Sequence, residues 1–314
     1  MSRKALIIGS LGQVGRELSS NLALKLGYEN VLSTDVKSDP DYEGRFEILD
    51  CLDEPALRDL VQRESITEVY HLAALLSATA EQNIDFAWKL SVNGLFNVLN
   101  LAKDGLIEKI FWPSSIAVFG PNTPRHQTPQ STIIEPTTVY GIGKQAGEQW
   151  CNYYHKRFGV DVRSVRYPGL IGWKSLPGGG TTDYAVDIFY SALKGERFNC
   201  FLNEDTFLPM MHMEDAIRAT LAIMEQDASN IKIRNSYNIS AMSFSPKTLA
   251  EELRKHFPNF EIEYKPDFRQ EIASSWPSSI DDAQARTDWG WKEQYGLSEL
   301  VQNMIENLKL QVQA

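Results

Sequence analysis

The 314-residue sequence has few cysteines, few histidines and no excess of basic residues. Its three cysteines (Cys51, Cys151 and Cys200) are odd in number and far apart, so free thiols in a reducing compartment are expected rather than disulfides. The five histidines do not combine with these cysteines at metal-ligand spacing, so no metal site is predicted. The formal net charge of −10 disfavours nucleic acid and anionic membranes as partners, because both require a basic face.

Long hydrophobic runs are also missing from the sequence. No apolar stretch approaches the roughly 20 residues that a membrane-spanning helix requires. The first apolar run begins within a few residues of Met1, so no signal or transit peptide is expected. These absences predict a cytoplasmic protein with no membrane partner. With 43% hydrophobic residues, the chain is long enough for one large or two smaller domains.

A glycine-rich turn directly after the first apolar run is the most informative feature of the sequence. The run Ala5–Ile8 is followed by Gly9, Gly12 and Gly15, and then by a helical pattern over 14–26. The first glycine permits a tight turn, the second lets the backbone approach a pyrophosphate, and the third lets the helix pack against the strand. Free N–H groups and a positive dipole at the helix N-terminus favour phosphate there. The segment therefore predicts a dinucleotide-binding turn.

An acidic residue stands twenty positions beyond the third glycine. Asp35 ends the next apolar run, over 31–34. A carboxylate at this place accepts hydrogen bonds from the ribose 2′-hydroxyl and repels a 2′-phosphate. The predicted cofactor is therefore NAD rather than NADP.

Strand-like and helical segments alternate through the first half of the chain. This alternation is typical of βαβ units around a parallel sheet. The expected strands lie over 45–49, 67–72, 110–112 and 160–166, and the expected longer helices over 81–103 and 140–158.

The pattern changes after Pro168, where glycine and proline cluster and the elements become shorter. The predicted fold class is α/β, with a Rossmann-type doubly wound parallel sheet and a smaller C-terminal α/β lobe. We expect residues 1–168 to form the NAD-binding domain, and residues 169–314 to form the substrate-binding lobe, with returns to the Rossmann sheet.

A tyrosine and a lysine four residues apart form the candidate catalytic pair. Tyr140 and Lys144 lie on one face of the expected helix. A neighbouring ammonium and an oxidised nicotinamide both favour the phenolate and lower the pKa of such a tyrosine. Taken alone, this spacing is more typical of a surface pair. Ser115, at the end of the preceding strand, favours the catalytic interpretation because its hydroxyl is expected to meet the phenol.

The order of these motifs resembles the extended short-chain dehydrogenase/reductase family over nearly the whole chain. The resemblance rests on the glycine turn, Asp35, Asp50, the His-Leu-Ala-Ala run 71–74, Asn93, the Ser-Ser-Ile-Ala-Val-Phe-Gly segment 114–120, Tyr140 with Lys144, the Arg-Tyr-Pro-Gly run 166–169 and the Trp-Gly-Trp run 289–291. It implies the following cofactor-binding residues: Gly9, Leu11, Gly12, Gln13, Val14, Asp35, Asp50, Cys51, Leu72, Ala73, Ala74, Asn93, Tyr140, Lys144, Tyr167 and Pro168.

The resemblance also implies a mechanism. Tyr140 would be the general base toward a substrate hydroxyl, Ser115 would orient that hydroxyl, and Lys144 would hold the nicotinamide ribose and tune the tyrosine. Asp50 and Cys51 would lie beside the adenine, and Asn93 would support the lysine through water.

Nucleotide-sugar epimerases and dehydratases are the main alternative within this fold. Such enzymes usually carry an asparagine where Gly169 stands, and an arginine-aspartate pair where this chain has Leu208 and Pro209. Loss of that arginine removes a bidentate phosphate clamp, so a diphosphate substrate is disfavoured.

The segment Gly-Gly-Thr-Thr-Asp-Tyr-Ala over 179–185 instead resembles the short-chain type L-threonine 3-dehydrogenases, as do the stretches 75–78 and 274–279. This resemblance predicts NAD-dependent oxidation of the β-hydroxyl of L-threonine to 2-amino-3-oxobutanoate. Thr182 or Asp183 is expected to cap the following helix, Asp183 to pair with the substrate ammonium, and Trp276 to cover the pocket. The expected substrate-binding residues are Ser77, Ser115, Tyr140, Thr181, Thr182, Asp183 and Trp276.

Three further expectations complete the interpretation. An NAD-binding sensor without turnover is disfavoured, because Ser115, Tyr140 and Lys144 are all retained.

A homodimer is expected, because in this family the two helices equivalent to 81–103 and 140–158 pair with those of a partner. His71 and His212 lie in apolar segments and are interpreted as hydrogen-bonded buried histidines rather than catalysts.

Overall fold

A six-stranded parallel sheet forms the centre of the N-terminal half in the computed structural model, which describes residues 3–313. The strand order is β3-β2-β1-β4-β5-β7, and every neighbouring pair is parallel. The strands are β1 (Ala5–Ile8), β2 (Val31–Asp35), β3 (Arg45–Ile48), β4 (Glu68–His71), β5 (Lys109–Phe111) and β7 (Asp161–Arg163). The order reverses between β1 and β4, and such a switch point is where open α/β sheets bind ligands. The predicted doubly wound parallel sheet is confirmed.

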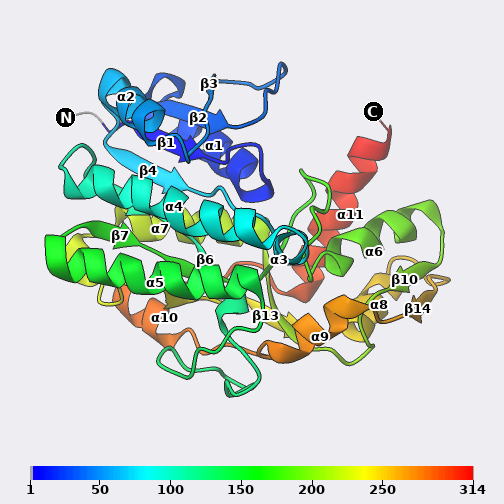
Figure 1. The fold of residues 1–314 in the computed structure, drawn as a ribbon. Coiled ribbons are helices and arrows are strands. Elements are labelled where there is room, and N and C mark those ends of the chain that lie inside the picture. Colours follow the sequence, from blue (N-terminus) through cyan, green and yellow to red (C-terminus); the bar gives the residue numbers. More distant parts are fainter. Residues whose placement is uncertain (1–2, 314) are drawn as a thin grey trace.

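Helices cover both faces of this sheet (Figure 1). The two faces are covered by α1 (Gln13–Leu26) with α7 (Met213–Glu225), and by α2 (Glu54–Glu64), α4 (Ile84–Lys103) and α5 (Val139–Phe158). Side chains alternate along β1, so Ile7 packs into the first cluster while Leu6 and Ile8 pack into the second. All four residues of β1 are buried, as expected for a parallel strand covered on both sides.

The strand expected over 160–166 is divided in two, which corrects the sequence prediction. The chain changes partner at Ser164, because the Arg163 carbonyl accepts from the Trp112 N–H while the Ser164 carbonyl accepts from the Tyr237 N–H. The second half is β8 (Val165–Tyr167), which lies between β6 (Ser114–Ser115) and β12 (Tyr237–Asn238) in a separate sheet.

The helix expected over 81–103 corresponds to α4, which begins three residues later than expected, and a short helix that was not expected, α3 (Ser77–Glu81), precedes it. Asn83, at the N-cap of α4, has a φ of −140°, which interrupts the helical path. The Glu81 carboxylate accepts a hydrogen bond from the Val139 N–H at 2.8 Å, so it ties the end of α3 to the beginning of α5.

Most of the rest of the chain packs beside the carboxyl ends of the central strands, whereas α10 (Ala283–Trp289) lies below α5 and belongs to the same core cluster as α1 and α7 (Figure 1). The remaining sheets are β9 (Gly169–Ile171) with β11 (Leu208–His212) and β13 (Met242–Phe244), and β10 (Phe198–Cys200) with β14 (Ile262–Tyr264). The remaining helices are α6 (Tyr184–Lys194), α8 (Pro246–Arg254), α9 (Phe268–Ser275) and α11 (Leu297–Gln313). Short 3₁₀ turns lie at Tyr28–Asn30, Ile116–Val118 and Ala228–Asn230. Within the described residues, no helix is long and apolar enough to cross a membrane.

Candidate active site

A cavity of about 670 Å³ lies at the carboxyl ends of β1, β4 and β6. Its walls come from the glycine turn, the loop after β4, the start of α5, the loop 174–183 and the end of α9. Most of the predicted site residues line it: Gly9, Leu11, Gly12, Gln13, Val14, Leu72, Ala74, Ser77, Ser115, Tyr140, Lys144, Tyr167, Pro168, Thr181, Thr182, Asp183 and Trp276. Residues more than 250 positions apart in sequence are therefore brought to one place.

Glycine is required at two positions of the turn between β1 and α1. Gly9 has a φ of +84°, and a Cβ there would lie 2.7 Å from the Ala73 nitrogen. A Cβ on Gly15 would lie 2.4 Å from the Gly9 carbonyl oxygen. At Gly12 the nearest atom would be 3.4 Å away, so this position opens toward the cavity. No side chain of the described residues caps the first N–H groups of α1, which leaves these donors for a phosphate ligand.

Asp35 is fixed beside this turn. Its Oδ2 atom accepts a hydrogen bond from the Leu11 N–H at 3.1 Å. The bond holds the carboxylate at the end of β2, where the ribose of a dinucleotide laid along the turn would meet it. The donor-rich turn and the neighbouring carboxylate together fit an NAD molecule.

Ser115 and Tyr140 face each other across the cavity. Ser115 ends β6, and its hydroxyl accepts from the Ala117 N–H at 3.2 Å. Tyr140 lies in the first turn of α5, which begins after Thr138, whose hydroxyl accepts from the Gly141 N–H at 3.1 Å. Burial raises the pKa of Tyr140 to about 12, and a hydrogen bond with Ser115 opposes that rise. The serine therefore favours the phenolate form.

Lys144 lies one turn further along α5 and is almost completely buried. Its Nζ atom donates to the Pro113 carbonyl at 2.6 Å and lies 4.6 Å from the centroid of the Trp112 ring. The same atom lies 5.6 Å from the centroid of the Tyr140 ring. Burial lowers the pKa of Lys144 to about 8. A buried ammonium at this distance stabilises a phenolate.

Hydroxyl groups and one carboxylate gather at the other end of the cavity. The Ser77 and Thr181 hydroxyls share a hydrogen bond of 3.1 Å, and both residues are buried. Asp183 stands at the N-cap position of α6, but its side chain makes no capping hydrogen bond there, so the capping prediction is wrong. Its Oδ2 atom instead accepts from the Gly179 and Gly180 N–H groups, each at 2.8 Å. Burial raises the pKa of this carboxyl group.

Trp276 has two environments. Its side chain is 5% exposed and belongs to the hydrophobic core of the C-terminal part, yet it also lines the cavity. The residue is therefore part of a fixed wall of the cavity.

Five predicted residues do not line the cavity: Asp35, Asp50, Cys51, Ala73 and Asn93. Of these, Asn93 faces away from it. It is exposed on α4, whereas Ser91, two positions earlier, is buried against Gly143 of α5. Two residues correspond to about 200° of helical rotation, so the two side chains leave opposite sides of the helix. The prediction that Asn93 supports Lys144 is therefore wrong. Helical periodicity is the signal that would have indicated Ser91, rather than Asn93, as the residue that faces α5.

The expected adenine residues lie near the same edge of the sheet but outside the cavity lining. Asp50 is exposed after β3 and accepts from the Leu52 N–H at 2.9 Å. Cys51 is buried, and its carbonyl accepts from the Asn97 amide at 2.8 Å. Contact of either residue with adenine stays a prediction.

The two buried histidines differ from each other. His212 is hydrogen-bonded as predicted, since its ring contacts the Asn303 amide oxygen at 3.2 Å and the Glu214 N–H at 3.3 Å. His71 is buried, but neither ring nitrogen has a hydrogen-bond partner among residues 3–313, which corrects that prediction. Burial lowers the pKa of His71 to about 3, and the nearby Lys144 adds to this effect.

The loop 174–183 contributes residues that the sequence analysis missed. Lys174 lines the cavity and pairs with Glu17 of α1 at 3.3 Å. The Gln13 side-chain amide donates to the Leu176 carbonyl at 3.2 Å. The loop 174–183 therefore packs against α1, the helix that follows the glycine turn. Irregular loops have no periodic signal, so the sequence did not reveal these contacts.

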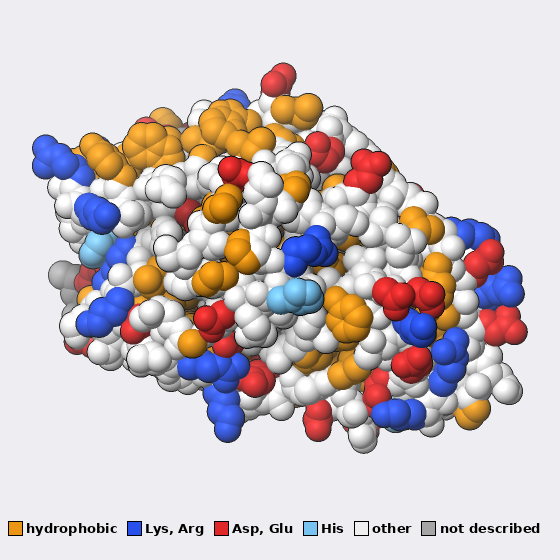
Figure 2. Space-filling view, turned by 90° about the horizontal axis from the view of Figure 1, so that it is seen from below, with side chains coloured by type: hydrophobic (Ala, Val, Ile, Leu, Met, Phe, Trp, Pro, Cys, Tyr) orange, Lys and Arg blue, Asp and Glu red, His pale blue; other side chains and the backbone are white. Residues whose placement is uncertain are grey.

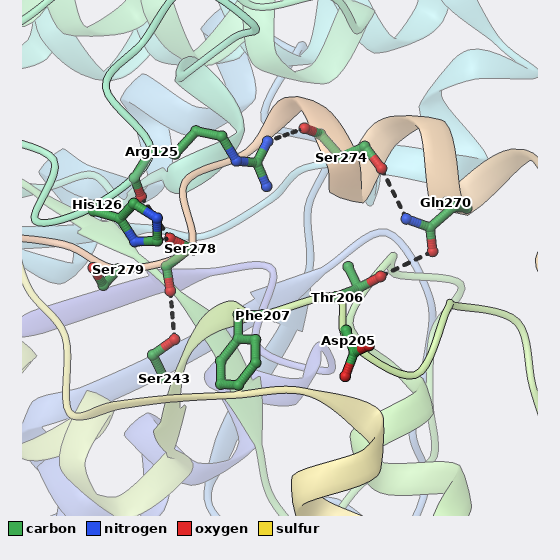
Figure 3. Close-up of a pocket in the computed structure, with 10 residues that line it drawn as sticks. All are labelled: Arg125, His126, Asp205, Thr206, Phe207, Ser243, Gln270, Ser274, Ser278 and Ser279. Atoms are coloured by element: carbon green, nitrogen blue, oxygen red, sulfur yellow. Dashed lines mark hydrogen bonds between the residues drawn. The ribbon is translucent and has the colours of Figure 1, made fainter.

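A second cavity of about 520 Å³ is lined by residues of α9, by Arg125 and His126, and by the segments around Phe207 and Ser278 (Figure 3). Its polar groups bond one another: His126 contacts the Ser278 hydroxyl at 2.9 Å, and Gln270 bridges Ser274 and Thr206. None of the predicted site residues lines this cavity. Within residues 3–313 there is also no group of three side chains able to hold a metal ion. The first cavity is therefore the candidate active site.

Comparison with known proteins agrees with this geometry. Residues 5–240 match the model of the NAD dependent epimerase/dehydratase family. The chain belongs to this family. It is 46% identical, over 98% of its length and 97% of the relative's, to an uncharacterized epimerase/dehydratase of Staphylococcus saprophyticus. The predicted membership of the extended short-chain dehydrogenases/reductases is thus confirmed.

Solved structures of this family give a finer comparison. A partial consensus L-threonine 3-dehydrogenase is 57% identical with a TM-score of 0.97, covering 98% of this chain and 99% of that one. The holo form of the GalE-like L-threonine dehydrogenase from Cupriavidus necator is 56% identical with a TM-score of 0.96, covering 97% of this chain and 99% of that one. A monomeric L-threonine 3-dehydrogenase from a metagenome is 45% identical with a TM-score of 0.95, covering 98% and 99%. This family member is an NAD-dependent enzyme, and the predicted cofactor is confirmed.

Proposed function

We propose that this enzyme oxidises the β-hydroxyl of L-threonine, forming 2-amino-3-oxobutanoate and NADH. One observation carries the proposal: a single cavity joins Ser115, Tyr140 and Lys144 to a second polar end built from Ser77, Thr181 and Asp183. The similarity to enzymes described as L-threonine dehydrogenases supports the choice of amino acid.

The proposed chemistry places a base at the hydroxyl of the substrate. Tyr140 removes the hydroxyl proton, and Ser115 orients that hydroxyl through the bond that also lowers the phenol pKa. Lys144 favours the phenolate and binds the nicotinamide ribose. NAD, when bound, supplies the acceptor for the hydride that leaves the β-carbon.

The opposite end of the cavity matches the two charged groups of a free amino acid. The Ser77, Thr181 and Thr182 hydroxyls offer donors to the carboxylate, and the Asp183 carboxylate pairs with the ammonium. Pairing with an ammonium lowers the raised pKa of Asp183 and so favours its charged form. Trp276 excludes water while hydride moves.

A nucleotide-sugar substrate is the second candidate, because the family also contains epimerases and dehydratases. The position of Gly169 argues against it. A Cβ there would lie 2.3 Å from the Met210 sulfur and 2.8 Å from Thr182 Cγ2, so an asparagine would displace the Met210 and Thr182 side chains. Pro209 and Leu208 are buried in β11, where neither side chain binds a diphosphate.

The decisive experiment is initial-rate NADH formation by the purified protein with NAD and L-threonine. L-serine, D-threonine and L-allo-threonine serve as controls, and NADP replaces NAD in a parallel series. We expect turnover with L-threonine that is selective for NAD. Turnover of a UDP-sugar without turnover of any amino acid would overturn the proposal, and NAD binding without any turnover would favour a sensor.

The proposal includes a cytoplasmic homodimer formed through α4 and α5. These helices expose large apolar side chains, among them Phe86, Trp88, Trp150 and Tyr153, each 38–49% exposed. Figure 2 shows hydrophobic side chains gathered along its upper edge. This edge corresponds to the front of Figure 1, where α4 and α5 lie. An apolar face of this kind is expected to be covered by a second copy.

A further inference from the structure

A buried carboxylate lies on the catalytic helix, one turn beyond Lys144. Glu148 is completely buried, and so is its partner Arg166 of β8. Its Oε1 atom accepts from Arg166 Nε at 2.8 Å, and its Oε2 atom accepts from Arg166 Nη2 at 2.7 Å. Oε1 also accepts from the Ser114 hydroxyl at 2.6 Å. Neither Glu148 nor Arg166 lines the cavity, so neither touches the reacting atoms.

This pair connects the elements that carry the site. Ser114 precedes Ser115 in β6, and Arg166 precedes Tyr167 in β8. Arg166 Nη1 also donates to the Asn238 amide oxygen at 3.0 Å. One carboxylate thus joins α5 to β6 and, through the guanidinium, to β8 and β12. A shift of Glu148 would move Ser115 relative to Tyr140.

Stability alone does not account for a charged pair at this place. Replacing a buried ion pair by well-packed apolar side chains is often neutral or stabilising. A negative charge at Glu148 has a role because the proposed mechanism needs Lys144 to stay protonated in the same part of the protein interior. Burial lowers the pKa of Lys144, and Cys151 and Glu148, the latter one helical turn away on α5, oppose that shift.

The other groups facing Lys144 offer it little negative charge. His71 on β4 stays neutral because burial lowers its pKa to about 3. The Cys151 thiol on α5 has a pKa raised by burial, which keeps it protonated at neutral pH. Tyr140 and the Trp112 ring complete the surroundings, with the Pro113 carbonyl as the hydrogen-bond acceptor. Glu148 is therefore the carboxylate that opposes the effect of burial on Lys144, although its charge is shared with the Arg166 guanidinium that it binds.

We propose that Glu148 is a positioning residue with two tasks: its charge keeps Lys144 protonated, and its bond to Ser114 holds Ser115 in register with Tyr140. The assignment rests on the proposed roles of Ser115, Tyr140 and Lys144. It predicts that the effect of the charge at position 148 on Lys144 and the effect of its hydrogen bond on Ser115 can be separated by substitution.

Three variants make this separation. Glu148→Gln keeps the shape, removes the charge and leaves the buried Arg166 guanidinium without its anionic partner. Glu148→Asp keeps the charge and shortens the reach, and Ser114→Ala removes one hydrogen bond while the charge stays. All three are expected to lower kcat by roughly tenfold to a hundredfold, because misplacement by about 1 Å has effects of that size. The KM for the amino acid should change little, since Ser77 and Thr181 lie on other elements.

The pH dependence distinguishes the two tasks. In Glu148→Gln, the alkaline limb of kcat/KM should move to lower pH by about one unit or more, because Lys144 loses its proton sooner. In Glu148→Asp and Ser114→Ala this limb should stay where it is in the wild type. A limb that does not move in Glu148→Gln, or that moves equally in all three variants, would overturn the proposal.

A measurement without substrate keeps this test independent of the proposed function. Competitive acetylation with acetic anhydride across a pH series, quantified at the Lys144 peptide by mass spectrometry, reports the pKa of Lys144 in the NAD-free protein. A lowered value in Glu148→Gln but not in Ser114→Ala supports the charge task even if L-threonine is not oxidised. If Glu148→Gln does not fold, Glu148→Asp and Ser114→Ala must still lower kcat with unchanged thermal stability of the fold; wild-type kcat in both would sink the geometric task.

Discussion

At the residue scale, the chemistry concentrates on one phenol. Tyr140 combines a raised pKa, a hydrogen bond to Ser115 and a buried ammonium 5.6 Å from its ring. Replacing it by phenylalanine removes the acid-base group and leaves the cavity otherwise unchanged. We expect Tyr140→Phe to lower kcat by at least about a thousandfold, within the range of lost general base catalysis. NAD binding, followed by quenching of tryptophan fluorescence, should persist.

Tyr28→Phe is a suitable control for that experiment, since it removes the same hydroxyl from an exposed tyrosine outside the cavity. Retention of more than a tenth of wild-type turnover in Tyr140→Phe would contradict the role of Tyr140 as base.

His71 predicts a pH dependence of stability. Its pKa is about 3 in the folded protein and close to 6.5 in an unfolded chain. Below about pH 6.5 the unfolded state therefore binds a proton that the folded state does not, so the free energy of unfolding falls as the pH falls. The contribution is about 1.4 kcal/mol per pH unit between pH 6 and pH 4.

Urea unfolding at several pH values measures this effect. His71→Leu and His71→Asn differ in polarity but both lack the titrating group, so both should show a shallower dependence on pH than the wild type. Parallel pH profiles for the wild type and both variants would contradict the assignment.

Where a motif names its own residues, the sequence predicted which side chains share one cavity. Ser115 ends β6, and Tyr140 and Lys144 lie in the first two turns of α5, so all three line it. The prediction failed for Asn93, because a motif alone does not say which side of a helix faces the site. It also did not foresee that Asp183 turns its carboxylate toward the glycine loop rather than the helix.

At the element scale, the β1–turn–α1 unit allows a matched comparison. Alanine at Gly15 would meet the Gly9 carbonyl at 2.4 Å and force strand and helix apart, whereas alanine at Gly12 has room within the protein. We expect Gly15→Ala to lower the melting temperature markedly, despite the better helix propensity of alanine. Gly12→Ala should fold normally but weaken NAD binding at least tenfold, because its methyl group points to where the pyrophosphate lies.

Calorimetry and a fluorescence titration with NAD test these expectations together. Equal melting temperatures for the two variants would contradict the packing argument, and wild-type NAD affinity in Gly12→Ala would contradict the position of the phosphates.

Element boundaries were less predictable than element types. The alternation of strands and helices gave the parallel sheet, but not the exchange of partners at Ser164 or the break between α3 and α4. Both depend on segments distant in sequence, namely the Tyr237 strand and the start of α5. Local periodicity contains no information about such partners.

At the scale of the whole molecule, the exposed apolar side chains of α4 and α5 predict assembly. Sedimentation should give a dimer for the wild type and a monomer for Trp150→Glu, since a buried unpaired carboxylate opposes association. Leu310→Glu is the control, because this exposed leucine lies on α11, outside the α4–α5 pair. A wild-type monomer, as in the monomeric relative, would contradict the prediction.

The short helix α3 has a consequence for how such an enzyme can change its substrate. It begins at Ser77, which contacts the amino-acid end of the cavity, and it ends at Glu81, whose carboxylate holds the first turn of the helix that carries Tyr140. If the proposed roles hold, amino-acid binding at Ser77 and proton removal by Tyr140 are linked by the five residues of α3. Variants selected for a new amino acid at Ser77 will inherit an altered rate with it, so specificity and speed in this scaffold evolve together rather than one at a time.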